Sequence, residues 1–315
     1  MWSYPNGQPV APVSFEAYGA AGDIDDLMAG DHLSGLLVVK NGEARLERYA
    51  KGLTREGRWQ SSSMVKSLVS TLIGAAVLDG LIDIDRTVPE YLPDFAATVY
   101  EGVAVRHLLT MTSRIEWSEN TDDLKSDVAG HYIEVIAARQ HGAIADYLKT
   151  RRRAVEPGTS YYYNTGDPFP LSPILSTVTG TTVAEYCSTK IWQPMGMERD
   201  GFFILDGDEP FGDEIICSCC VASLRDYAKW GTLMIADGAA LGQRILPGAG
   251  SNSPPLRRRP TSRSTSKARG GGAGPTTTKT PGTGSCGGVT RTGRSRRSAA
   301  TASGSRSTGP MTWWW

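Results

Sequence analysis

The chain has little of three things on which whole protein classes depend: cysteine, histidine and apolar runs long enough to span a bilayer. Its five cysteines form an odd set without the spacing of a disulfide framework: Cys187, Cys217, Cys219, Cys220 and Cys286. Three of them crowd one short apolar run with no histidine nearby, so we expect buried thiols rather than zinc ligands. Residues 1–7 lack the basic segment and the apolar stretch of a secretory leader. We therefore expect a cytoplasmic protein without a membrane anchor.

The chain also has no net charge, but its two signs are unevenly distributed. Residues 248–315 hold twelve of the 33 basic residues and no acidic one, which leaves 21 basic against 33 acidic residues in 1–247. The same 68 residues contain 13 Gly, 11 Ser and 12 Thr, but only two residues from Leu, Ile, Val and Phe. Such a segment cannot bury enough apolar area to offset its ordering entropy, so we expect a disordered basic tail. A tail of this kind can bind phosphate groups non-specifically, and we expect no specific nucleic-acid partner.

The remaining residues predict a mixture of helices and strands. Two strand-like runs, 34–40 and 44–49, flank the turn dipeptide Asn41-Gly42 and predict a β-hairpin. Residues 64–78 are apolar apart from Lys66 and small side chains, which predicts a buried helix. We expect residues 81–95 to wrap the surface, further helices at 105–112, 144–150, 170–179, 183–192 and 223–236, and a strand at 202–205. This order predicts an α/β (α+β) fold, with a mixed lobe of residues 1–65 and 195–247 and an inserted helical lobe of residues 66–194.

One short pattern carries candidate chemistry. Ser63 and Lys66 form an S-x-x-K pair at the start of the apolar helix, and residues three apart on a helix share a face. The lysine could then accept the serine proton and make Ser63 a nucleophile. The pattern alone is weak, because Ser264 and Lys267 repeat it inside the low-complexity tail. On the four-residue pattern alone, we favour the interpretation of Ser63 as a helix cap beside a solvated lysine.

A second motif supplies that context. Residues 156–167 read EPGTSYYYNTGD, and further characteristic phrases lie at 81–93, 105–113, 191–197 and 224–228. In these motifs the chain resembles the serine β-lactamase-related hydrolases, the group of class C β-lactamases, esterases and 6-aminohexanoate-dimer hydrolases. Its Y-N-T-G-D wording is most similar to the nylon-oligomer hydrolase branch. The resemblance spans about residues 30–247 and implies a β-lactamase-like antiparallel sheet lobe with an inserted all-helical lobe.

The resemblance also implies the remaining site residues. In that family the catalytic tyrosine lies four residues after the threonine of the Pro-Gly-Thr turn, which selects Tyr163 to move protons between Ser63 and the leaving group. A literal Y-x-N pattern instead fits Tyr162 with Asn164, and we favour Tyr163. Asn164, Glu116 and Trp117 are expected to bind substrate near the mouth of the cleft, although surface packing is an equal interpretation for the last two.

The chain departs from the family at two places. Relatives usually carry Thr-Ser-Gly where this chain has Ser113-Arg114, and a side chain there adds strain if the position requires a positive φ. The family's third motif, a K-T-G-like strand that supplies one oxyanion donor, is not found after Pro247. Residues 279–282 (KTPG) only mimic it, because a proline intrudes. The abrupt change of composition indicates a frameshift near codon 247, with the C-terminal sheet strands missing and the product destabilised or prone to aggregate.

These observations predict a serine hydrolase that forms an acyl-enzyme on a small-molecule amide or ester substrate, of the 6-aminohexanoate-oligomer hydrolase, esterase or β-lactamase type. The alternative is a catalytically impaired relic or binding scaffold without its third motif. The resemblance implies no metal and no organic cofactor, and the sequence says nothing of oligomeric state.

Overall fold

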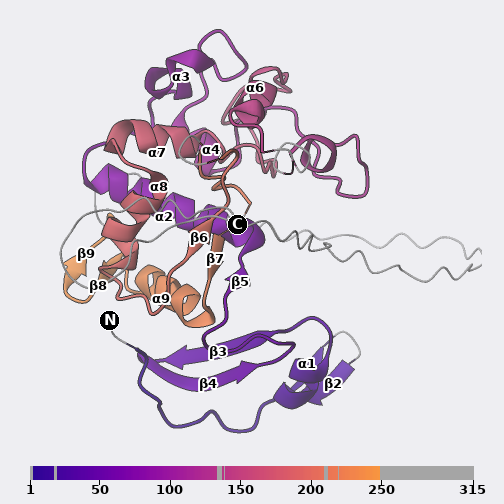
Figure 1. Cartoon of the computed structure of the whole chain (residues 1–315), viewed down its shortest axis with the longest axis vertical. Coiled ribbons are helices and arrows are strands. Elements are labelled where there is room, and N and C mark those ends of the chain that lie inside the picture. The colour runs from indigo at the N-terminus through magenta and orange to yellow at the C-terminus, as the bar shows by residue number, and fades with distance from the viewer. Residues whose placement is uncertain are drawn as a thin grey trace, which may run out of the picture. The chain divides into compact units, whose positions relative to one another are not determined.

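The computed structural model describes residues 3–17, 20–132, 137, 139–208, 212–218 and 220–248 (Figure 1). All of these residues belong to one compact unit. The predicted tail and the expected absence of C-terminal strands lie outside the described residues from position 249 onward, so they remain predictions, as does the division into two lobes.

Within the described ranges, the strands form four small antiparallel sheets. They are β1 (Ser14–Ala17) with β2 (Ala20–Asp23), β3 (Gly35–Lys40) with β4 (Glu43–Tyr49), β8 (Ala239–Ala240) with β9 (Gln243–Arg244), and a three-stranded sheet of β5 (Trp59–Gln60), β7 (Cys220–Ala222) and β6 (Phe202–Phe203) in that order. The predicted hairpin is confirmed. Its turn residues Asn41 and Gly42 have φ values of 53° and 79°, the left-handed pair that a tight hairpin turn requires.

Two sequence interpretations of strands need correction. The strand expected at 202–205 is only two residues long, because it pairs with β7 over Phe202 and Phe203 alone. The apolar cysteine run contributes β7, the middle strand of the three-stranded sheet, which the sequence analysis did not predict. The described cysteines, Cys187, Cys217 and Cys220, are buried, as expected.

The helices occupy most of the predicted positions. They are α1 (Ile24–Ala29), α2 (Val65–Leu78), α3 (Val88–Tyr91), α4 (Val105–Leu109), α6 (Ala143–Lys149), α7 (Leu171–Thr179), α8 (Val183–Cys187) and α9 (Leu224–Ile235), with short turns η1 (Ser62–Met64), η2 (Pro93–Phe95), η3 (Asp127–Tyr132) and η4 (Ser188–Trp192). The helix expected at 105–112 ends earlier, at Leu109, and the one expected at 183–192 continues from α8 as the π-helical turn η4. Ser223 caps α9 as predicted, accepting a hydrogen bond from the backbone of Asp226.

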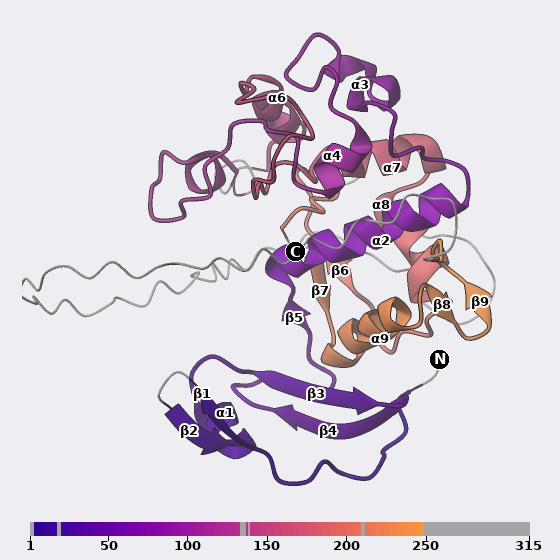
Figure 2. The same cartoon turned by 180° about the vertical axis from the view of Figure 1, so that it is seen from behind.

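The long apolar helix α2 lies at the centre of the core. Val65, Leu68, Val69, Leu72 and Ile73 on it are each at most 1% exposed. Figures 1 and 2 show α2 running between α7 on one side and the strands β6 and β7 with α9 on the other. A helix that is apolar almost all round is stable only when neighbours cover it on several sides. Its packing therefore fixes the place of the residues at its N-terminus.

The hairpin β3–β4 is tied to α9 by a buried ion pair. The Arg225 guanidinium, 1% exposed, donates hydrogen bonds of 2.8 and 2.6 Å to the two carboxylate oxygens of Glu47 on β4. The N-terminal segment adds backbone hydrogen bonds to the same strand, from Gly7 to Ala44 and from Val10 to Arg45. The hairpin therefore has partners other than the C-terminal strands expected from the family.

Candidate active site

A sharp turn presents Ser63 at the start of α2. The backbone N–H of Ser61 donates to the Cys220 carbonyl at 2.8 Å, and the Cys220 N–H donates to Ser61 Oγ at 2.9 Å, so the chain is bonded to β7 up to this point. Ser62 then adopts a φ of 45°, a left-handed conformation that costs a residue with a side chain about 1–2 kcal/mol. The turn leaves the Ser63 side chain exposed at the helix N-terminus, where backbone N–H groups and the helix dipole favour negative charge.

Three predicted residues meet at this position. Lys66 Nζ donates a hydrogen bond to Ser63 Oγ at 3.0 Å, and the Tyr163 hydroxyl donates to the same oxygen at 2.8 Å. The ammonium also lies 5.3 Å from the centre of the Tyr163 ring. Ser63 Oγ is therefore hydrogen-bonded to two groups, an amine and a phenol, that can each carry a proton.

The neighbouring tyrosine points elsewhere. Tyr162 donates its hydroxyl to the carbonyl of Trp117 at 3.0 Å, and its backbone N–H donates to the carbonyl of Met111 at 2.9 Å. Of the two candidate tyrosines, Tyr163 is the one in contact with Ser63.

The residues expected to bind substrate, Asn164, Trp117 and Glu116, differ in how far they are exposed. Asn164 is 2% exposed, and its amide is occupied by Ile115, Gly166 and Asp167. Trp117 is 5% exposed and packs edge-on against Tyr147. Both side chains are therefore almost fully buried, which does not favour direct contact with a substrate, and their expected role stays a prediction. Glu116 is exposed, so its role stays a prediction.

Two residues of this site, Thr165 and Glu119, were not predicted from the sequence. Thr165 lies two positions after Tyr163, where the Y-x-N pattern has its asparagine, and its Oγ1 accepts a hydrogen bond from Lys66 Nζ at 3.5 Å. Glu119 in turn accepts hydrogen bonds from both the backbone N–H and the hydroxyl of Thr165. Applying the Y-x-N spacing to Tyr163 rather than Tyr162 would have pointed to Thr165. No sequence signal marks Glu119.

A buried carboxyl lies behind the tyrosine loop. Asp167 is 1% exposed and accepts a hydrogen bond of 2.5 Å from Ser113 Oγ. Burial raises the pKa of Asp167 to about 7, although the Ser113 hydrogen bond and the positive charge of Arg114 act in the opposite direction. Arg114 does have the positive φ suspected from the sequence, 60°, and its guanidinium carbon lies 5.3 Å from the centre of the Tyr162 ring.

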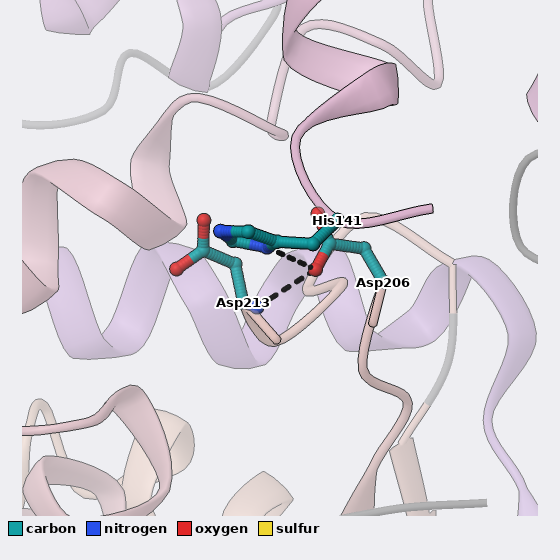
Figure 3. A group of neighbouring side chains, drawn as sticks. All are labelled: His141, Asp206 and Asp213. Atoms are coloured by element: carbon teal, nitrogen blue, oxygen red, sulfur yellow. Dashed lines mark hydrogen bonds and ion pairs between the residues drawn. The ribbon is translucent and has the colours of Figure 1, made fainter. Parts of the chain in front are cut away.

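A second titratable cluster lies away from these residues, and Figure 3 shows its three side chains converging. His141, Asp206 and Asp213 each offer one metal-ligand atom, all within 4.8 Å of one another. The buried Asp206 carboxylate already accepts hydrogen bonds from His141 Nδ1 at 2.9 Å and from the backbone of Asp213 at 2.8 Å (Figure 3). It also accepts one from the backbone of Gly142 at 3.0 Å. The hydrogen bond between His141 and Asp206 raises the pKa of His141. The cluster thus joins two chain segments through hydrogen bonds alone, a sufficient structural reason for its geometry.

Taken together, a serine at a helix N-terminus, a lysine one turn later and a tyrosine from a distant loop define the S-x-x-K class of serine hydrolase site. The family model named Beta-lactamase matches residues 20–314, and the chain belongs to this family. The match begins before, and ends well after, the 30–247 span of the resemblance read from the motifs.

Similarity to individual proteins is consistent with this family. The chain is 31% identical over 229 residues to a 6-aminohexanoate-dimer hydrolase of Paenarthrobacter ureafaciens, covering 71% of this chain but only 57% of that relative. A solved structure assigned as a 6-aminohexanoate-dimer hydrolase from Bacillus anthracis matches with a TM-score of 0.69 at 23% identity, over 78% of this chain and 66% of that one. EstCE1, a hydrolase with promiscuous acyltransferase activity, matches with a TM-score of 0.53 at 17% identity, over 69% and 70% of the two chains. The structural matches show a shared β-lactamase-like fold. Among the helices in the described part of the chain, none is both long and apolar enough to cross a membrane.

Proposed function

We propose that this chain hydrolyses amide or ester bonds of small molecules through an acyl-enzyme on Ser63. The observation that carries the proposal is the contact of Ser63 Oγ with both Lys66 Nζ and the Tyr163 hydroxyl, at 3.0 and 2.8 Å. A hydroxyl becomes an effective nucleophile when a base within hydrogen-bond reach takes its proton.

In the acylation step, Ser63 Oγ attacks the substrate carbonyl carbon while its proton passes to Lys66, which acts as a neutral amine. The carbonyl oxygen gains negative charge beside the N-terminus of α2, where backbone N–H groups can stabilise it. The carbon–nitrogen or carbon–oxygen bond then breaks. The Tyr163 hydroxyl gives its proton to the leaving amine or alcohol and is reprotonated by Lys66.

In the deacylation step, a water molecule attacks the ester carbonyl of acylated Ser63. Tyr163 and Lys66 take the water proton and return it to Ser63 Oγ as the acid leaves. The two names among the relatives that specify chemistry, the amide-cleaving dimer hydrolase and the acyl-transferring EstCE1, support amide and ester substrates. A linear amide of the aminohexanoate type is the first substrate to try, since that relative has the highest identity of the three.

The test is labelling of the full chain by a fluorophosphonate, which reacts with activated serines. We expect labelling of the wild type and its loss in Ser63→Ala. Ser264→Ala is the matched control, because Ser264 has the same S-x-x-K spacing and should not matter. Equal labelling of Ser63→Ala would refute the assignment. Labelling through Ser63 without turnover of any ester or amide would instead support the impaired relic.

A further inference from the structure

We propose that Glu119 is a positioning residue, which orients the Thr165 hydroxyl so that the lone pair of Lys66 faces Ser63. The inference rests on the proposed function and adds a residue to it. Glu119 lies 46 positions from Thr165 along the chain and meets it only through the fold.

The carboxylate of Glu119 binds Thr165 at two points. One oxygen accepts the Thr165 backbone N–H, and the other accepts the Thr165 hydroxyl proton at 3.0 Å. An ionised carboxylate is an acceptor only, so the Thr165 hydroxyl must be the donor of this bond. Thr165 is 5% exposed, which leaves water little access to its hydroxyl. The hydroxyl proton therefore points at Glu119, and a lone pair of Thr165 Oγ1 faces Lys66.

Among the residues that the structure describes, three oxygens lie within hydrogen-bond distance of Lys66 Nζ. They are Ser63 Oγ at 3.0 Å, Thr165 Oγ1 at 3.5 Å and the backbone carbonyl of Cys217. As an ammonium, Lys66 donates to all three oxygens. Once it has lost one proton to act as the base, its amine has two N–H groups and one lone pair. The Cys217 carbonyl can only accept, and Thr165 with its proton committed to Glu119 can also only accept. The two N–H groups are thus assigned to these two oxygens, and the lone pair is left for the proton of Ser63.

Without the carboxylate, this assignment is lost. A threonine hydroxyl rotates freely and can donate as well as accept. If the Thr165 proton turned towards Lys66, it would compete with Ser63 for the amine lone pair. An asparagine carbonyl in the same place would need no such support, but Asn164 is directed away, to Ile115 and the loop backbone. Glu119 supplies the orientation that a hydroxyl cannot supply for itself.

The experiment is a double-mutant cycle on Glu119→Gln and Thr165→Val, with Thr165→Ser as the conservative variant. The full chain is assayed for kcat and KM with p-nitrophenyl acetate and for melting temperature. We expect each of Glu119→Gln and Thr165→Val to lower kcat about tenfold with KM unchanged, a part of the roughly 10²–10⁴-fold that a positioned base contributes. The double variant should lose no more than the worse single variant, because both changes remove the same orientation. Thr165→Ser should retain nearly full activity.

The matched control is Asp122→Asn, which removes one exposed carboxylate from the same loop and should change neither kcat nor KM. Additive losses in the double variant, or an unchanged kcat in Glu119→Gln, would overturn the inference while leaving the hydrolase proposal intact. The inference would also be overturned if the variants lost activity only in proportion to a lower melting temperature. If Glu119→Gln does not fold, the contrast between Thr165→Val and Thr165→Ser decides. If Ser63→Ala kept the hydrolytic activity of the wild type, the proposed function itself would be rejected, and the inference with it.

Discussion

The hydroxyl of Tyr163 donates a 2.8 Å hydrogen bond to Ser63 Oγ across 100 positions of sequence. The adjacent Tyr162 donates its own hydroxyl to a backbone carbonyl instead, that of Trp117. Two neighbouring tyrosines thus have different partners, one in the candidate active site and one in the supporting loop.

The two tyrosines should respond differently to loss of the hydroxyl. Tyr163→Phe removes a proton carrier, and we expect the rate of ester hydrolysis to fall about 10²-fold or more, with little change in stability. Tyr162→Phe removes one partly buried hydrogen bond and should cost about 1 kcal/mol of unfolding free energy, with nearly full activity. Steady-state kinetics and urea denaturation of both variants measure the contrast. If Tyr162→Phe instead lost activity and Tyr163→Phe did not, Tyr162 would be the catalytic tyrosine.

The backbone at Arg114 should be strained. Its φ of 60° disfavours any residue with a side chain, and its guanidinium packs over Tyr162. Arg114→Gly and Arg114→Ala both remove the guanidinium, but only glycine relieves the strain. We expect the glycine variant to be more stable than the alanine variant by about 1 kcal/mol in urea denaturation. Equal stability of the two would show that φ at this position carries no cost.

Asp167 should make stability depend on pH. Its pKa is raised by burial to about 7, so the folded protein binds a proton that the unfolded chain has released. For an acid shifted in this direction, the stabilising contribution is present below its ordinary pKa near 4 and is lost as the pH rises towards 7. Asp167→Asn stays neutral and can still accept from Ser113. We expect the free energy of unfolding of Asp167→Asn, relative to that of the wild type, to rise by a few kcal/mol between pH 5 and pH 8. The slope approaches about 1.4 kcal/mol for each pH unit below the pKa of Asp167.

Urea denaturation of both proteins at each pH unit tests this expectation, because groups such as His141 contribute equally to both and cancel in the difference. Parallel stability profiles would mean that the Asp167 carboxyl titrates normally.

The Glu47–Arg225 pair should hold the hairpin to α9. Glu47→Gln removes the carboxylate nearest to the buried Arg225 guanidinium and leaves that of Glu198 at 3.7 Å, so we expect a loss of about 2 kcal/mol. Glu43→Gln on the same strand breaks a half-buried pair with Arg45 and should cost about 1 kcal/mol or less. Chemical denaturation of the two variants measures the difference. Similar small losses would show that other contacts anchor the hairpin.

Several features could be predicted because they depend on neighbours in sequence. The Ser63–Lys66 spacing on a helix, the Asn41-Gly42 turn and the Ser223 cap each follow from backbone geometry within a few residues. The resemblance then pointed to Tyr163, the distant tyrosine whose hydroxyl lies within hydrogen-bond distance of Ser63 Oγ. The three-residue strand β7 was missed because its pairing partners lie far away in sequence.

By itself, then, the sequence determined which residues could be nucleophile and base, and that they share one face of a buried helix. Only the tertiary structure decided that Tyr163 rather than Tyr162 reaches Ser63, that Asn164 and Trp117 point inward, and that Thr165 backed by Glu119 touches Lys66. The physical reason is that local spacing sets the geometry along one element. Which side chain faces a neighbour or the interior depends instead on how loops distant in sequence pack together.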